Sequence, residues 1–192
     1  SIQLSASEGI KIGLLISETN NLAARDGAEL AIREANTKGG YAGQPFHLIV
    51  RSTEGPWGTG SKESVNLIFN EKVVAIMGSL DGRNAHLVEQ VATKTRILCL
   101  AARATEMSLT QAFVPWHFRC VPNDDQQATS LIREIYKNRK IYNVAVIGTE
   151  DYDSRNAVSS FNRMADSLKV TAPKQYIYQS SVVDIQKVLK DT

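Results

Sequence analysis

Apolar and polar positions along the chain alternate between two kinds of segment. Short, continuous apolar runs, such as residues 10–16 and 73–79, are separated by longer stretches in which apolar residues recur every three or four positions. The stretch after the first run is typical, with Ala24, Ala28 and Ala35 at helical spacing. Continuous runs of this length predict buried strands, and the helical spacing predicts amphipathic helices.

The pattern repeats along the sequence of 192 residues. Strands are expected at residues 10–16, 45–52, 73–79, 96–102, 116–121, 143–148 and 175–180. Helices are expected at residues 23–40, 61–71, 84–95, 123–140, 154–169 and 183–192. Such alternation predicts an α/β fold, namely a doubly wound parallel sheet covered on both faces, followed by a partial second α/β lobe.

The boundary between the two parts is expected at "CVPND", residues 120–124. Residues 1–120 would form a first, Rossmann-like lobe, and residues 121–192 a crossover helix with an incomplete second lobe. Asn123 or Asp124 is the expected N-cap of that helix, because short polar side chains bond the free amides of a first turn.

Charge and hydropathy exclude several kinds of partner. Twenty-two Lys and Arg oppose 20 Asp and Glu, and no dense basic block points to nucleic acid or an anionic membrane. The apolar runs fall well short of the roughly 20 residues that span a bilayer, so no membrane span is expected. The opening "SIQLSASEG" has neither the charged nor the apolar region of a signal peptide. A mature chain would already have lost such a peptide.

Two cysteines, Cys99 and Cys120, lie in apolar runs without the C-x-x-C spacing of metal or redox sites. Two buried thiols are therefore expected, with a disulfide as the alternative for an exported protein.

Small residues end two of the predicted strands. Gly78 and Ser79 stop one apolar run, and Thr105 follows another. Gly78 would let a ligand or another backbone come close, while the Ser79 hydroxyl would either cap the next helix, which is the favoured reading, or bind a ligand. Because strand ends of a parallel sheet share an edge, the two ends together suggest a pocket for an anionic group.

Several segments, in order and spacing, resemble those of type I periplasmic binding proteins, within them the branched-chain amino acid and amide binding proteins of ABC transporters. The resemblance is carried by "IKIGLLIS" with "DGAELAIREANTKGG", "VVAIMGS", "ILCLAARAT", "FRCVPNDDQQ" and "VAVIGTEDYDSRNAVSSF". It covers nearly the whole chain, although no single motif decides it.

The resemblance implies a set of ligand-binding residues. Ser79, Arg103, Ala104 and Thr105 match the positions that hold the ligand carboxylate, and Tyr152 matches an aromatic contact from the second lobe, with a half-exposed loop tyrosine as the alternative. Arg103 departs from the small residue usual there. Its side chain either turns to solvent or enters the pocket, where a guanidinium would favour a ligand with an extra carboxylate.

Other departures concern the cleft wall and the second lobe. The loop "ETNNL" is shorter than the family's, and "STEGPWGTGSKES" replaces an acidic strand end. Trp57 in that stretch would either stack on a ligand or cover the sheet edge, and cover is favoured. The second lobe is expected to be truncated, which makes closure about a hinge near residues 121–125 doubtful.

Enzymatic motifs are weak. The stretch "GPWGTGSKES" fails as a P-loop because Ser61 separates Gly60 from Lys62, and no G-x-G-x-x-G follows the first strand. His47, His86 and His117 show no acid or thiol at metal or triad spacing and are interpreted as structural or surface residues. The acidic residues at 150, 151 and 153 would hold Mg²⁺ in a phosphoacceptor, but a solvated loop is the simpler reading.

The sequence and the resemblance together predict a non-enzymatic, extracytoplasmic solute-binding component of an ABC transporter, periplasmic or extracellular, with no cofactor and no metal. Its ligand would be a small amino acid or a related carboxylate or amide. Its partners would be a membrane permease and, through unpaired strand edges, a second copy in a homodimer. The alternative is a ligand-sensing or protein-interaction module that works by dimerisation rather than transport.

Overall fold

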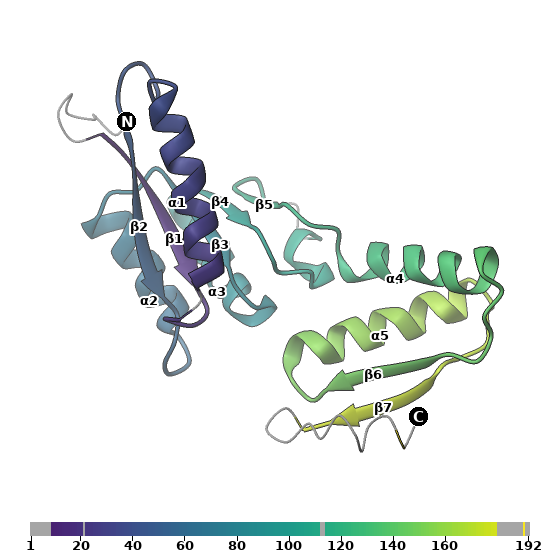
Figure 1. Cartoon of the computed structure of the whole chain (residues 1–192). Helices are drawn as coiled ribbons and strands as arrows, with labels where there is room; N and C mark the ends of the chain where they lie inside the picture. The colour runs from purple at the N-terminus through teal and green to yellow at the C-terminus, as the bar shows by residue number, and fades with distance from the viewer. Residues whose placement is uncertain (1–8, 21, 112–113, 180–189, 191–192) are drawn as a thin grey trace. The chain divides into compact units, whose positions relative to one another are not determined.

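The computed structural model describes residues 9–20, 22–111, 114–179 and 190, apart from the side chain of Ser79. The helix expected at residues 183–192 therefore lies outside the described residues, except for one position. The chain divides into two compact units (Figure 1). Unit 1 comprises Ser1–Ala104 and Ser108–Val121, and unit 2 comprises Thr105–Met107 and Pro122–Thr192.

Unit 1 contains a five-stranded parallel sheet with the order β2-β1-β3-β4-β5. Its strands are β1 (Ile10–Ile16), β2 (Phe46–Ser52), β3 (Ala75–Ser79), β4 (Leu98–Ala101) and β5 (His117–Arg119). Helices connect the first four strands, as the alternating sequence pattern predicts. The expected α/β fold with a parallel sheet is confirmed.

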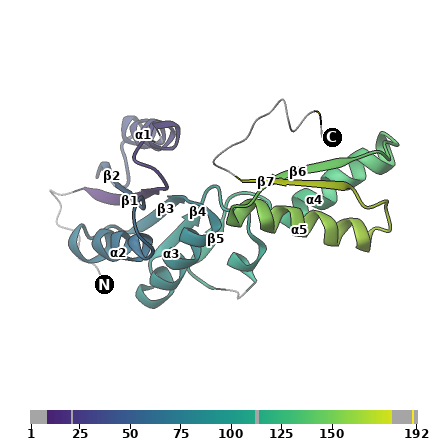
Figure 2. The ribbon, with the colours of Figure 1, turned by 90° about the horizontal axis from the view of Figure 1, so that it is seen from below.

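Helices lie on both faces of this sheet (Figure 2). One face carries α1 (Leu22–Thr37), and the other carries α2 (Thr59–Val65) and α3 (Gly82–Thr95). Wider π-type turns, η1 (Asn66–Asn70), continue α2. The two faces are unequal, because α1 buries none of its residues while α2 and α3 bury several.

The main core lies between the sheet and the α2–α3 layer. Leu15, Leu67, Ile76 and Val88 are fully buried there. Gly13 in β1 makes the contact with Leu67 possible, since a Cβ on Gly13 would lie 2.9 Å from the Leu67 Cδ1 atom. Close packing of this kind leaves little room for added atoms.

Unit 2 contains a smaller layer pair. Its elements are α4 (Asp124–Ile132), η3 (Arg133–Asn138), β6 (Ala145–Thr149), α5 (Tyr152–Ser167) and β7 (Lys174–Tyr178). The strands β6 and β7 pair in parallel, and a second core joins Ile132 of α4 to Phe161 of α5. Asn123 caps α4 with a reciprocal capping box, in which Asn123 Oδ1 accepts from the Gln126 amide at 2.8 Å and Gln126 Oε1 accepts from the Asn123 amide at 2.9 Å. The expected N-cap at this boundary is therefore confirmed as Asn123.

The two cysteines are both free thiols but differ in environment. Cys99 is buried in β4, and burial, with a smaller effect of Glu89, raises its pKa to about 12. Cys120 is exposed, because it directly follows the edge strand β5. The expectation of two buried thiols is correct for Cys99 and wrong for Cys120. No helix in the described part of the chain has the length and apolar character to cross a bilayer.

His117 is a buried polar residue of β5. It is 5% exposed, and no described residue forms a hydrogen bond with either of its ring nitrogens. Burial lowers the pKa of this imidazole below the ordinary 6.5, and the nearby charges of Arg119 and His86 act in the same direction. The folded protein therefore holds His117 neutral.

Adding a methyl group at Gly13 should destabilise unit 1. In Gly13→Ala the new Cβ meets a fully buried leucine, and overpacking of this kind costs about 1–3 kcal/mol. Urea unfolding followed by circular dichroism measures the change. The matched control is Gly27→Ala in α1, where a Cβ meets no atom within 4 Å and the higher helix propensity should raise stability. Equal stability of the Gly13 variant and the parent would contradict the packing.

Stability should fall with acidity because of His117. Its pKa is lower in the folded than in the unfolded chain, so its contribution is fully present above the unfolded value of 6.5 and declines as pH falls below it. The slope from one such group is at most about 1.4 kcal/mol per pH unit. Urea unfolding at a series of pH values should show a flatter profile for His117→Phe than for the parent. The same substitution at the exposed His47 is the matched control.

Candidate functional site

The order of the strands reverses beside β1. The chain passes from β1 outward to β2 and then returns to place β3 on the other side of β1. At this switch point Ile16, the last residue of β1, lies in register with Ser52 of β2 and Ser79 of β3. In open α/β sheets ligands bind in the crevice at the carboxyl ends of strands where the order reverses.

Ser79 ends β3 at this switch point, although the position of its hydroxyl lies outside the described structure. The favoured reading of Ser79 as a helix cap is wrong. Asp81 is the N-cap of α3, and its Oδ1 atom accepts from the Asn84 amide at 2.9 Å. The chain runs two residues past the strand end before the helix begins, so the capping position falls on the aspartate.

Gly78 serves the packing of its own chain. A Cβ on Gly78 would lie 3.0 Å from the Cδ1 atom of Leu80, which is 2% exposed. The Gly78 carbonyl accepts from the Ala102 amide at 2.9 Å, which extends the β3–β4 pairing beyond the strand. The space beside this glycine is therefore filled by Leu80 rather than left open for a ligand.

The residues after β4 divide between the two units. Arg103 is exposed and Ala104 is buried, and both belong to unit 1. Thr105 is half-buried and belongs to unit 2, where its carbonyl accepts from the Asp124 amide at 2.9 Å. Ser79, Arg103 and Ala104 thus share one unit, and Thr105 is placed in the other.

Tyr152 is the first residue of α5 in unit 2 and is 37% exposed. Asp151 precedes it as the N-cap, accepting from the Ser154 amide at 3.0 Å and from the Thr149 hydroxyl. These bonds, the Thr149 hydroxyl foremost, lower the pKa of Asp151. In the part of the chain that the structure describes, no group of three His, Cys, Asp or Glu side chains is arranged to hold a metal ion.

The ligand contacts expected for Ser79, Arg103, Ala104, Thr105 and Tyr152 remain predictions.

The structure adds a link between the loops after β1 and β2. Glu54 Oε2 accepts from the Thr19 amide at 3.0 Å and from the Thr19 hydroxyl at 2.6 Å. The hydroxyl first and the amide second lower the pKa of the exposed Glu54 carboxyl. The signal in the sequence is positional: each residue follows a strand end by two or three positions, and the two strand ends are in register.

The sequence-based expectation for Trp57 also differs from the structure. Trp57 is 71% exposed, so the expectation that it covers the sheet edge is wrong. The Arg83 guanidinium carbon lies 5.6 Å from the centre of its ring, a cation–π arrangement. Trp57 precedes α2, and Arg83 lies in the first turn of α3, so both are at the carboxyl edge of the sheet.

His86 has an acidic neighbour, contrary to the interpretation of the three histidines. His86 Nδ1 is 3.3 Å from Glu89 Oε2, and His86 Nε2 is 3.0 Å from Ser108 Oγ. The His-x-x-Glu spacing within one helix places both side chains on the same face and was the available signal. Ser108, His86 and Glu89 together have the residue types of a hydrolase triad. Glu89 is buried, His86 and Glu89 lie on α3, and Ser108 lies on η2 (Met107–Thr110).

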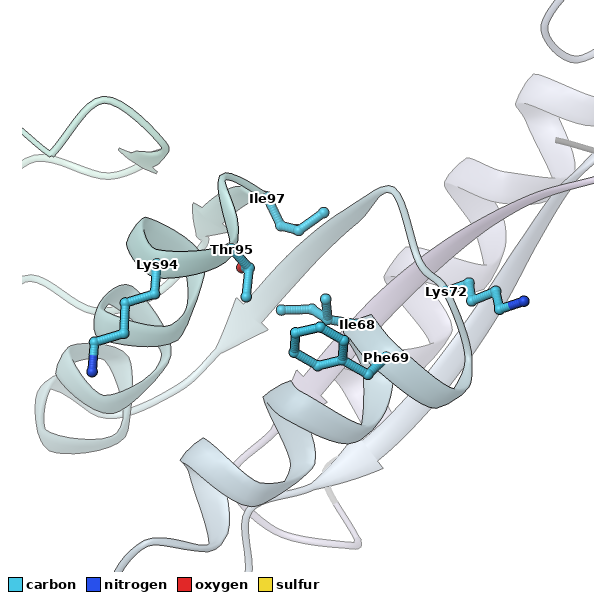
Figure 3. Close-up of a pocket in the computed structure, with 6 residues that line it drawn as sticks. All are labelled: Ile68, Phe69, Lys72, Lys94, Thr95 and Ile97. Carbon is cyan, nitrogen blue, oxygen red and sulfur yellow. The ribbon is translucent and has the colours of Figure 1, made fainter. Parts of the chain in front are cut away.

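A cavity of about 510 Å³ lies at the opposite edge of the sheet (Figure 3). Ile68, Phe69 and Ile97 form its apolar lining, with Thr95 beside them. In Figure 3 the charged ends of Lys72 and Lys94 point away from this lining. These residues come just before β3 and β4, so the cavity is at the amino ends of the strands and is separate from the switch point.

Comparisons with known proteins show which family the chain belongs to. Residues 9–191 match the periplasmic binding protein family. The Leu/Ile/Val-binding protein BraC3 of Rhizobium johnstonii is 25% identical over 171 residues, which are 86% of this chain and 46% of BraC3.

Solved structures show the same fold. The branched-chain amino acid transporter substrate binding protein LivJ of Streptococcus pneumoniae, in complex with isoleucine, is 22% identical with a TM-score of 0.79, over 96% of this chain and 54% of LivJ. An ABC transporter substrate-binding protein of Desulfitobacterium hafniense in complex with Leu is 22% identical with a TM-score of 0.75, over 96% of this chain and 55% of that one. The chain spans about half the length of these relatives. It belongs to the periplasmic binding protein family, which is non-enzymatic.

Proposed function

We propose that this chain is part of an extracytoplasmic solute-binding protein of an ABC transporter and that unit 1 binds a small amino acid, or a related carboxylate or amide, at the carboxyl edge of its sheet. The protein would act in the periplasm or outside the cell and deliver its ligand to a membrane permease. Ser79, Arg103, Ala104, Thr105 and Tyr152 are the proposed ligand contacts.

The observation that carries this proposal is the position of Ser79. It ends β3 beside Ile16 at the point where the strand order reverses. Unpaired amides at such strand ends attract an anionic group, and a hydroxyl adds a donor that can turn toward it. The start of α3 follows within three residues and adds its partial positive charge to the same edge.

The named relatives support the ligand class. LivJ of S. pneumoniae was solved with isoleucine, and the D. hafniense protein with Leu. Both ligands are amino acids, whose common feature is the carboxylate with its neighbouring ammonium. Glu54, ionised at neutral pH and fixed by Thr19, provides a negative group near the same edge that would suit the ammonium.

One observation favours the alternative, a module that acts by self-association. The edge strand β5 carries Phe118, 52% exposed, and is preceded by Trp116, 37% exposed. An edge strand with exposed aromatic side chains is a template for pairing with another chain. A homodimer formed through β5 is compatible with ligand binding and is proposed together with it.

Ligand binding should depend on the two hydroxyl residues. Calorimetric titration of the parent with a panel of amino acids and amides should give millimolar or tighter binding to at least one compound. Ser79→Ala with Thr105→Ala should weaken it by about tenfold or more, because two donors to a carboxylate are removed. The control is Ser167→Ala near the end of α5, whose hydroxyl bonds only its own helix among the described contacts. Absence of heat with every compound, alongside a dimer in solution, would favour the interaction module instead.

The oligomeric state should depend on β5. Light scattering at tens of micromolar should give the mass of a dimer for the parent. Phe118→Lys should shift the mass to that of a monomer, because a charge on the exposed edge opposes strand pairing. Tyr41→Lys, at a residue that is 68% exposed in the turn before β2, is the matched control and should stay dimeric. A monomeric parent would rule out the proposed dimer and leave the ligand proposal standing.

A further inference from the structure

A tight turn over residues 56–59 holds the side chain of Trp57 in solvent. The amide and hydroxyl of Thr59 both donate to the Pro56 carbonyl, at 3.1 and 2.7 Å. Gly58 has φ 95° and ψ −9°, the values of the third residue of a type II turn, and this makes Trp57 the second residue, the first of the two corner positions. Gly55, with φ 134°, sets the direction of the chain before the turn. Both glycines adopt conformations that side-chain-bearing residues rarely do.

The base of this loop is fixed to the sheet. The Thr53 amide donates to the Ile16 carbonyl at 2.8 Å, and Thr19 donates to Glu54 through both its amide and its hydroxyl. The loop thus extends the β1–β2 pairing before it turns at Gly55. An exposed indole on an anchored loop keeps its position without being buried, so its exposure does not come from a loose segment.

The first turns of α2 and α3 hold Trp57 next to Arg83. A Cβ on Gly60 would lie 2.9 Å from Asn84 Oδ1, so the two helices approach closely at this end. Asn84 is itself fixed by Asp81, with Asn84 Nδ2 donating to Asp81 Oδ2 at 2.8 Å. The result is the 5.6 Å separation between the Arg83 guanidinium carbon and the centre of the Trp57 ring. The chain reaches Arg83 four residues after Ser79, so the pair stands beside the switch point.

Trp57 is the most exposed of the large hydrophobic side chains that the structure describes. Tryptophan and arginine are the residues that contribute most when they become buried in a binding site. Here 71% of the indole surface stays accessible despite the contact with Arg83, so most of the ring is open to a second flat group. The adjacent guanidinium supplies paired donors whose geometry fits a carboxylate.

We infer that Trp57 and Arg83 form a specificity subsite for an aromatic carboxylate, whose ring stacks on the indole and whose carboxylate binds the guanidinium. The inference rests on the proposed binding function and narrows its ligand class. Aliphatic amino acids would lack the stacking contact. Aromatic amides would lack the charge that Arg83 attracts. An aromatic amino acid satisfies both and can also place its ammonium near Glu54.

Four compounds separate these features: benzoate, phenylalanine, leucine and benzamide. Calorimetric titration gives the affinities, and tryptophan fluorescence reports on Trp57, with Trp116→Phe removing the other tryptophan. Benzoate and phenylalanine should bind at least tenfold more tightly than leucine and benzamide and should quench the fluorescence of Trp116→Phe. Trp57→Leu should reduce benzoate affinity about tenfold, and Trp57→Phe should restore part of it.

Arg83→Gln should weaken benzoate about tenfold, because the ion pair with the carboxylate is lost, and should change benzamide binding much less. Trp57 is exposed, so its variants should fold, which circular dichroism checks. Leucine binding that equals or exceeds benzoate binding, and that ignores both substitutions, would overturn the subsite and leave the proposed function intact. No binding of any carboxylate would count against the proposed function itself. A change of mass on light scattering with Trp57→Leu, without a change in affinity, would show that the indole contacts a second protein, and would also overturn the subsite.

Discussion

The central constraint in unit 1 is that β1 pairs with two strands that the chain reaches in opposite directions. β2 follows β1 in sequence and lies on one side, and β3 lies on the other. The loops that leave β1 and β3 therefore diverge to opposite faces of the sheet and cannot close over the strand ends. In open α/β sheets such connectivity opens a crevice at the strand ends, and here the register places Ile16 and Ser79 side by side at that point.

Packing supports this edge from one face more than from the other. The fully buried side chains gather between the sheet and α2–α3, where Gly13 admits Leu67. The helix α1 on the other face buries no residue. The elements that carry Trp57 and Arg83 thus belong to the well-packed layer, and the contact between Gly60 and Asn84 joins them. Groups on rigid elements keep their geometry at lower entropic cost than groups on free loops.

The fold could be predicted from the sequence because buried parallel strands leave continuous apolar runs such as residues 10–16. The position of Ser79 at a strand end followed from the same pattern. The expectation that Ser79 caps the helix was wrong, because Asp81, two residues further on, accepts the hydrogen bond from the Asn84 amide. Local spacing does not reveal where a helix starts to within two residues.

Local turn geometry and contacts between distant residues account for most other errors. The sequence predicts that Trp57 covers an edge, yet two glycines with positive φ turn it outward, and such angles are not visible in composition. Glu54 and Thr19 are 35 residues apart and meet only because their strands are in register. The partners of His86 come from one turn along its helix and from a segment 22 residues away. Residue types can suggest such contacts, but it is the sheet register that brings Glu54 to Thr19.

The two cysteines differ in their accessibility to thiol reagents. The Cys99 thiol is enclosed in the sheet and keeps its proton, whereas the Cys120 sulfur is open to solvent at the end of β5. Because thiol reagents attack the accessible thiolate, a maleimide dye at neutral pH would attach at one position and leave the core undisturbed. The chain can therefore carry a single label on Cys120, next to Val121, the last residue of unit 1, with no engineered cysteine.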